Sequence, residues 1–281
     1  MQVHPTIAGT RAASRTARAR GARVGLVPTM GYLHRGHLEL IRQARERAQW
    51  VAVSLFVNPT QFGPTEDLER YPRAFERDVA LCEGEGVDVL FAPSPAEMYT
   101  PGAQTFVTVE ELSKPLCGAA RPGHFRGVAT VVAKLFHIVE PDVAVFGEKD
   151  YQQLQVIRRM VRDLDMPVEV VGVPTVRDAD GLALSSRNQY LSREERDRAL
   201  CLSRALASAR DLVAAGETDA ERVLERVAVI LSEGTAELDY AEIRDAETLA
   251  AVQRIERPVV LALAARIGAT RLIDNTMLTP A

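Results

Sequence analysis

The chain has 281 residues, enough for one large domain or two modest ones. Its 47% hydrophobic and 26% charged residues are ordinary for a globular protein, and its formal charge of −4 argues against nucleic-acid binding as its main role. No apolar run is long enough to span a bilayer, so we expect no membrane association. Three widely spaced cysteines without a C-x-x-C pair are typical of reduced thiols, which favours a cytoplasmic enzyme.

The first patterned segment is rich in alanine and arginine. Arg11, Arg15 and Arg18 share one helical face, and Gly21 would end that helix. The lack of acidic residues also resembles an organellar transit peptide, but the spacing favours a surface helix that leads into the first strand. That strand is predicted by the apolar run at residues 23–27.

Strand and helix patterns alternate through the first two-thirds of the chain. Further strands are expected at residues 51–57, 88–91, 144–146 and 168–173. Helices are expected from residue 38 onward and at residues 75–83, 127–139 and 151–163. This alternation predicts an α/β fold with a doubly wound, Rossmann-like parallel sheet, which binds ligands at the carboxyl ends of its strands.

The pattern changes after residue 177. Ser192 and Glu195 form a capping box at the start of a long helix that runs to about residue 215. A second helix is expected at residues 218–233, and strand-like runs follow at residues 238–243, 258–264 and 270–273. We therefore expect an N-terminal domain over residues 1–176 and a smaller α+β domain over residues 177–281.

Two histidines, His34 and His37, follow the first strand. Residues 28–31 are typical of a turn, and helical spacing begins at Leu38, so both imidazoles should lie beside a helix N-terminus, where unpaired amides attract anions. Gly36 leaves room for a ligand. This arrangement suits phosphate chemistry, although such a pair can also be structural. The absence of a third ligand at the usual spacing argues against zinc.

Four more polar segments fall at strand ends or helix starts: residues 58–62, 121–127, 146–153 and 184–188. Ordinary turns, capped loops or surface ion pairs are the alternative interpretation of each. Lys149 is one of only three lysines in the chain, which hints at a required point charge. No Gly-rich phosphate loop is present, so phosphates would be held by the histidines, Lys149 and residues 185–187. This combination favours nucleotidyl transfer, with attack at the α-phosphorus.

Five motifs together resemble the pantoate–β-alanine ligase (pantothenate synthetase) family, from residue 24 to about residue 275. They are Val-Pro-Thr-Met-Gly-x-Leu-His-x-Gly-His (27–37), Phe-Val-Asn-Pro-Thr-Gln-Phe (56–62), Arg-Pro-Gly-His-Phe-x-Gly-Val (121–128), Phe-Gly-Glu-Lys-Asp-Tyr-Gln-Gln-Leu (146–154) and Asp-Gly-Leu-Ala-Leu-Ser-Ser-Arg-Asn-x-Tyr-Leu-Ser (180–192). The His-x-Gly-His motif alone is shared with many nucleotidylyl transferases.

Two alternatives stay open. A nucleotidylyl transferase acting on a phosphate acceptor would need a cationic acceptor site, where this chain has the neutral Gln61 and Gln153. A non-catalytic nucleotide-binding protein would be expected to lack at least one of the histidines, Lys149 or Arg187, and all of them are present.

The resemblance implies an AMP-forming acid–amino-acid ligase. Such an enzyme condenses pantoate with β-alanine through a pantoyl adenylate and releases AMP and pyrophosphate. ATP would be a substrate accompanied by Mg²⁺, with Asp78 as a candidate metal ligand. The C-terminal domain would act as a lid over the reactive intermediate, and the protein would be a cytoplasmic homodimer.

The resemblance also assigns residues to roles. His37, the proton donor, would act in catalysis with His34, Lys149 and Arg187. Gln61 and Gln153 would bind pantoate, and Gln61 would also bind β-alanine. The ATP-binding set would be Met30, Gly31, Tyr32, Leu33, His34, Arg35, Gly36, His37, Gly147, Glu148, Lys149, Asp150, Val176, Leu184, Ser185, Ser186 and Arg187. For Arg121 and His124, β-alanine handling, an interface and a structural role all remain open.

Overall fold

The structure is a computed structural model that describes residues 1–64 and 66–280. Internal contacts divide these residues into two compact units. The first unit comprises the described parts of residues 1–113, 121–148 and 153–174, and the second comprises residues 114–120, 149–152 and 175–280. Two short segments from the first two-thirds of the chain, one of which contains Lys149, therefore pack with the C-terminal part.

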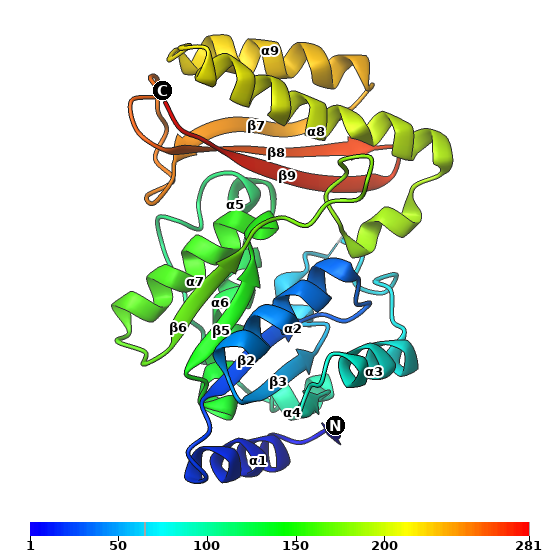
Figure 1. Ribbon diagram of the computed structural model, residues 1–281, viewed down its shortest axis with the longest axis vertical. Helices are drawn as coiled ribbons and strands as arrows, with labels where there is room; N and C mark the ends of the chain where they lie inside the picture. Colours follow the sequence, from blue (N-terminus) through cyan, green and yellow to red (C-terminus); the bar gives the residue numbers. More distant parts are fainter. Residues whose placement is uncertain (65, 281) are drawn as a thin grey trace. The chain divides into compact units, whose positions relative to one another are not determined.

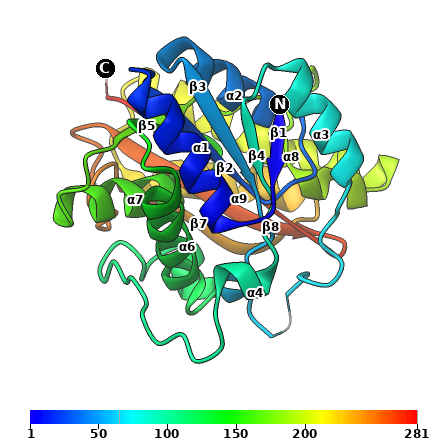
Figure 2. The same ribbon diagram turned by 90° about the horizontal axis from the view of Figure 1, so that it is seen from below.

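The first unit is built on a parallel sheet of six strands, ordered β1-β4-β3-β2-β5-β6 (Figure 1 labels β2, β3, β5 and β6, and Figure 2 labels β1 and β4). The strands are β1 (Gln2–His4), β2 (Val24–Thr29), β3 (Trp50–Leu55), β4 (Val89–Phe91), β5 (Val143–Gly147) and β6 (Glu169–Val173). The predicted α/β class with a doubly wound parallel sheet is confirmed. The strand order reverses between β2 and β5, and ligands of this fold bind at the carboxyl ends of the strands beside such a reversal.

Helices cover both faces of this sheet. They are α1 (Ile7–Ala19), α2 (Arg35–Arg47), α3 (Phe75–Gly84), α4 (Pro95–Met98), α6 (His124–Val139) and α7 (Tyr151–Asp163). In Figure 2, α2 and α3 lie on one side of the sheet and α6 and α7 on the other. The apolar stripe of α2, formed by Leu40, Ile41 and Ala44, packs in one buried cluster with Val27 and Val53 of the sheet. The strands are apolar because they are buried on both faces.

The second unit is a layer of two helices on an antiparallel sheet, with the short α5 (Cys117–Ala120) alongside (Figure 1). Its long helices are α8 (Arg193–Ala214) and α9 (Ala220–Glu233), and its strands are β7 (Glu237–Asp245), β8 (Val259–Ile267) and β9 (Thr270–Leu278), in that order. The predicted capping box begins α8: Glu195 N–H donates to Ser192 Oγ at 3.1 Å, and Ser192 N–H donates to Glu195 Oε2 at 2.8 Å. The α+β character that the sequence predicted for the C-terminal domain is confirmed.

Several element boundaries differ from the sequence prediction. β2 continues through Pro28 and Thr29, which the sequence assigned to a turn. Its pairing with β5 extends only over Gly25 and Leu26, so the missing N–H of Pro28 interrupts no ladder on that side. α2 begins at Arg35 rather than residue 38, which places His37 within its first turn. The short β1 was not predicted, and β9 is longer than expected.

The N-terminal surface helix is confirmed as α1, which Thr6 caps by accepting a hydrogen bond from the N–H of Gly9. Over the residues that the structure describes, no helix combines the length and the hydropathy needed to cross a membrane.

Candidate active site

The two histidines lie where the chain enters α2, as predicted. His34 is the N-cap residue, and the ring centroids of His34 and His37 are 4.1 Å apart. The main-chain N–H of His34 donates to Nδ1 of His37 at 3.3 Å. Because Nδ1 accepts this hydrogen bond, a neutral His37 ring carries its proton on Nε2. The site therefore offers an imidazole donor beside the amides of a helix N-terminus, an arrangement that suits an anion.

A cluster of neutral amides occupies the loop after β3. Asn58, which is 1% exposed, accepts hydrogen bonds on Oδ1 from the hydroxyls of Thr60 and Tyr99, both at 2.9 Å. Its Nδ2 donates to Oε1 of Gln61 at 3.0 Å, and Nε2 of Gln61 donates to Sδ of Met30 at 3.1 Å. The loops that follow β2 and β3 are thereby joined through the side chain of Gln61.

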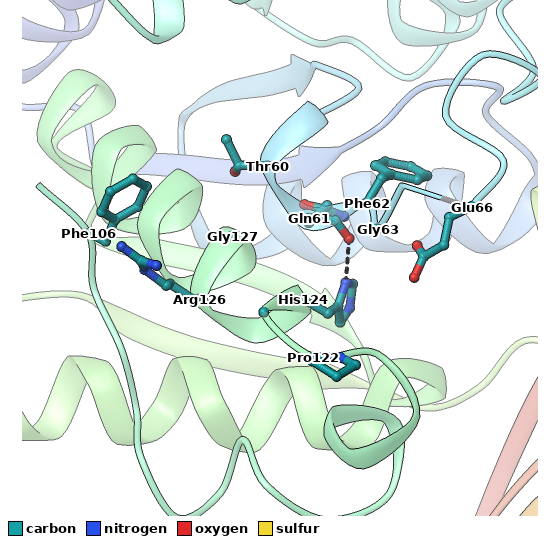
Figure 3. A pocket seen from close by; sticks show the side chains of 11 residues that line it. Thr60, Gln61, Phe62, Gly63, Glu66, Phe106, Pro122, His124, Arg126 and Gly127 are labelled. Atoms are coloured by element: carbon teal, nitrogen blue, oxygen red, sulfur yellow. Dashed lines mark hydrogen bonds between the residues drawn. The ribbon is translucent and has the colours of Figure 1, made fainter. Parts of the chain in front are cut away.

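Arg121 and His124, whose roles the sequence left open, support the main chain of Gln61. His124 Nδ1 lies 2.8 Å from the carbonyl oxygen of Gln61 and so must donate to it, and Arg121 donates to the same oxygen at 3.2 Å (Figure 3 shows His124). Arg121 also pairs with Glu66, with 2.9 Å between Nε and Oε1. Burial alone would raise the pKa of Glu66, but the hydrogen bond and charge of Arg121 outweigh it and hold that pKa below the ordinary glutamate value.

Gly127 lets α6 pack closely against this loop. A Cβ at position 127 would lie 2.7 Å from the nitrogen of Gln61 and would also collide with the carbonyl oxygen of Thr60. Only glycine fits a backbone approach of this kind. The glycine in the third motif therefore has a packing reason, since it sets the position of Gln61.

A pocket of about 170 Å³ lies beside the main chain of Gln61 (Figure 3). Its charged walls are engaged within the protein: Glu66 pairs with Arg121, and the guanidinium of Arg126 lies 3.7 Å from the ring centroid of Phe106. The charge of Glu66 is thereby compensated, whereas that of Arg126 is only stacked on an aromatic ring.

In the second unit, the chain brings Val176 beside the fifth motif. Leu184 N–H donates to the carbonyl oxygen of Val176 at 3.0 Å. Ser185 then caps a short 3₁₀ helix (Ser186–Tyr190) by accepting from Arg187 N–H at 3.2 Å. Five positions of the expected ATP set, Val176 and residues 184–187, thus lie close together.

Lys149 lies in a 3₁₀ turn (Glu148–Asp150) directly after β5. Its carbonyl oxygen accepts from Nδ2 of Asn275 on β9 at 2.8 Å. The preceding residue Asp274, which is 3% exposed, binds Arg177 through both carboxylate oxygens at 2.6 and 2.8 Å. Adjacent residues of β9 therefore hold the Lys149 turn and the segment that follows Val176. The sequence did not predict this role of Asp274 and Asn275. Their signal in the sequence was that two polar residues stand between apolar ones.

Asp78, the candidate metal ligand, lies in the first turn of α3 and is 1% exposed. Its carboxylate accepts hydrogen bonds from the N–H groups of Tyr32 at 2.7 Å and Leu33 at 2.8 Å. Within residues 1–64 and 66–280, no three His, Cys, Asp or Glu side chains gather closely enough to hold a metal ion. This environment does not fit a Mg²⁺ ligand, because the cation would face two amide donors.

A doubly wound sheet whose central strand leads into a helix N-terminus lined by two imidazoles defines a nucleotide-binding α/β protein. Comparison with known proteins narrows this class. The family model described as pantoate-beta-alanine ligase matches residues 2–277, and the chain belongs to this family.

Individual relatives agree with this assignment. The pantothenate synthetase of Geobacter sulfurreducens is 55% identical over 279 residues, which are 99% of each chain, and that of Moorella thermoacetica is 56% identical over 281 residues, again 99% of each. The crystal structure of pantothenate synthetase from Thermus thermophilus matches with a TM-score of 0.94 and 51% identity over all of both chains. A Francisella tularensis pantoate-beta-alanine ligase, complexed with beta-gamma ATP and beta-alanine, matches with a TM-score of 0.83 and 34% identity over 99% of this chain and 97% of that one.

The close approach at Gly127 generates a prediction about the loop that carries Gln61. Gly127→Ala should displace this loop and, because Gln61 is a candidate pantoate-binding residue, lower kcat/KM for pantoate by about 100-fold, as a misplacement of about 1 Å can. The KM for ATP should stay near the wild-type value. Gly84→Ala is the matched control, because no atom lies within 4 Å of a Cβ there. Unaltered pantoate kinetics in the Gly127 variant would contradict this account of the loop.

The Glu66–Arg121 pair generates a prediction about stability. A carboxyl group whose pKa is depressed by folding stabilises the protein above its unfolded pKa, and this contribution is lost as the pH falls. Glu66→Gln should therefore lower the free energy of unfolding at neutral pH, and its difference from wild type should shrink below about pH 4.5, the ordinary pKa of the group. Urea titrations across this range test the prediction, with the exposed Glu256→Gln as control. A difference that does not vary with pH would count against it.

Proposed function

We propose that this protein is an ATP-dependent ligase that condenses pantoate with β-alanine to form pantothenate, AMP and pyrophosphate. The observation that carries the proposal is the match of the chain to the pantoate-beta-alanine ligase family over residues 2–277. The neutral amide cluster beside the histidine turn supports it, because amides bind hydroxyl and carboxylate groups without adding a positive charge. A carboxylate bound in this way stays nucleophilic.

In the proposed first step, a carboxylate oxygen of pantoate attacks the α-phosphorus of ATP, and pyrophosphate leaves. Gln61 and Gln153 would hold pantoate for this attack, so that positioning supplies part of the rate. His34 and His37 of the first unit would donate to phosphate oxygens, with His37 using its Nε2–H. The reaction product is a mixed anhydride, pantoyl adenylate.

Other cationic and hydroxyl side chains would also contact the phosphates. We assign this role to Lys149, Ser185, Ser186 and Arg187, and we assign the nucleoside part of ATP to Gly147, Asp150 and the main chain of Val176. The anchoring of Lys149 by Asn275 and of Val176 by Leu184 supports these assignments, since donors fixed in advance stabilise developing charge best. Mg²⁺ would reach the site bound to phosphate oxygens of ATP.

In the proposed second step, the amine of β-alanine attacks the acyl carbon of pantoyl adenylate. The acyl C–O bond breaks, AMP leaves with the bridging oxygen, and the amine loses a proton to give the amide. Gln61 would take part in binding β-alanine as well as pantoate.

An ATP–pyrophosphate exchange assay tests the proposed function. Exchange of labelled pyrophosphate into ATP should require pantoate and should proceed without β-alanine, because adenylation alone is reversible. Exchange driven by a phosphate-bearing acceptor in place of pantoate would instead indicate a nucleotidylyl transferase. No exchange with either acceptor would contradict both activities.

Lys149→Ala should reduce the rate of this exchange by about 100- to 1000-fold, the typical loss on removing a donor that stabilises charge in the transition state. Arg15→Ala is the control, since it also removes a single positive charge but from an exposed surface pair with Glu140. Equal exchange rates in wild type and in the Lys149 variant would remove Lys149 from the catalytic set.

We also propose a cytoplasmic homodimer. Cys82, Cys117 and Cys201 are buried thiols, and burial raises the pKa of Cys82 to about 12, in keeping with packing roles in a reducing compartment. For the dimer, residues 103–109 are a mostly exposed run rich in β-formers, and within the described chain they join neither sheet. Main-chain groups of this run would pair with those of the same segment in a second copy, about a two-fold axis.

Phe106, 43% exposed at the middle of this run, tests the dimer. Phe106→Asp should convert the dimer to a monomer in sedimentation analysis, because two buried carboxylates would face each other across the axis. Leu164→Asp, at a position 53% exposed elsewhere on the first unit, should leave the dimer intact. A wild-type monomer, or a Phe106 variant that remains dimeric, would contradict the proposed interface.

A further inference from the structure

The turn that precedes the histidine pair has backbone dihedral angles that are unfavourable for most residues. Gly31 and Tyr32 both have positive φ, at +85° and +52°. Glycine adopts this region readily, but a tyrosine does so only where its surroundings hold it there. Something outside residues 30–34 must therefore fix the turn before His34 and His37 can be placed.

The first turn of α3 supplies that support from 45 residues further along the chain. Both oxygens of Asp78 accept main-chain N–H groups, Oδ2 from Tyr32 at 2.7 Å and Oδ1 from Leu33 at 2.8 Å. Arg77 approaches the same peptide groups: its guanidinium donates to the carbonyl oxygen of Leu33 at 2.9 Å and lies 5.0 Å from the ring centroid of Tyr32. Asp78 and Arg77 thus form hydrogen bonds with successive peptide groups of the turn.

We propose that Asp78 is the positioning residue of the histidine turn and that Arg77 assists it, a role that rests on the proposed function. A buried carboxylate with two short charge-assisted hydrogen bonds to amides fixes both donors in direction. Because Leu33 is joined directly to the N-cap His34, fixing its peptide group fixes the entry into α2. His37 then lies in the first turn of that helix, with its ring centroid 4.1 Å from that of His34.

This role differs from metal binding in a measurable way. A ligand to Mg²⁺ would, when replaced, raise the metal concentration needed for activity, and saturating metal would restore the rate. A positioning residue would, when replaced, lower the rate of adenylation at every metal concentration. Asparagine discriminates well, because its amide keeps the size of aspartate but offers a single acceptor oxygen and would turn its NH₂ toward one of the two N–H donors.

The test compares wild type, Asp78→Asn and Asp163→Asn in pantoate-dependent ATP–pyrophosphate exchange over a range of Mg²⁺ concentrations. Asp163 pairs with Arg159 on the exposed face of α7 and serves as control. Asp78→Asn should lower the maximal exchange rate by about 100-fold, with the half-saturating Mg²⁺ concentration unchanged. A rate restored by high Mg²⁺, or a rate equal to wild type, would overturn the proposal. Absence of exchange in wild type would instead refute the proposed function.

A measurement on the wild-type protein keeps the proposal testable if the variant does not fold. In hydrogen exchange followed by NMR without substrates, the amides of Tyr32 and Leu33 should be strongly protected although both lie in a connecting turn. Arg77→Met, which leaves Asp78 in place, should lower this protection of the two amides. It should also reduce the rate of ATP–pyrophosphate exchange, by about tenfold or less. Hydrogen exchange of the two wild-type amides as fast as that of exposed loop amides would overturn the proposal.

Discussion

Parallel pairing of β2 with both β3 and β5 is the constraint on which the first unit depends. The register aligns Val24–Thr29 with Trp50–Leu55, and Gly25 with Val143, so three strands end at one edge of the sheet. A polar segment follows each strand at that edge. The histidine turn follows β2, the loop with the amide cluster follows β3, and Gly147 is the last residue of β5. The buried valines and leucines of these strands thus determine which polar residues meet.

Beyond the strand ends, hydrogen bonds from distant residues fix the polar groups. Asn58 directs the side chain of Gln61, while His124 and Arg121 hold its main chain. In the second unit, Asp274 and Asn275 on β9 hold Arg177 and the Lys149 turn. Both units follow the same principle, in which groups expected to contact substrate are held by hydrogen bonds from buried or half-buried polar residues.

The sequence predicts the parts of this structure that depend on local patterns. α7 is found with its observed limits, the Ser192–Glu195 capping box begins α8 as expected, and the histidines lie at a helix N-terminus. Short or context-dependent elements were missed: β1 has three residues, and Pro28 continues β2 at a position where β2 no longer pairs with β5. Asp78, Asn275 and Arg121 could not be given their roles, because each acts on a residue far away in the sequence. The resemblance supplies residue identities, whereas only the fold supplies these partners.

In the proposed first step, a carboxylate oxygen of pantoate becomes bonded to the α-phosphorus of ATP. Formation of this bond can be traced with pantoate that carries ¹⁸O in both carboxylate oxygens, by mass spectrometry of the products after complete turnover with ATP and β-alanine. The account predicts AMP that carries one ¹⁸O atom and pantothenate that retains the other in its amide carbonyl. Label in inorganic phosphate or pyrophosphate, or AMP without label, would contradict it.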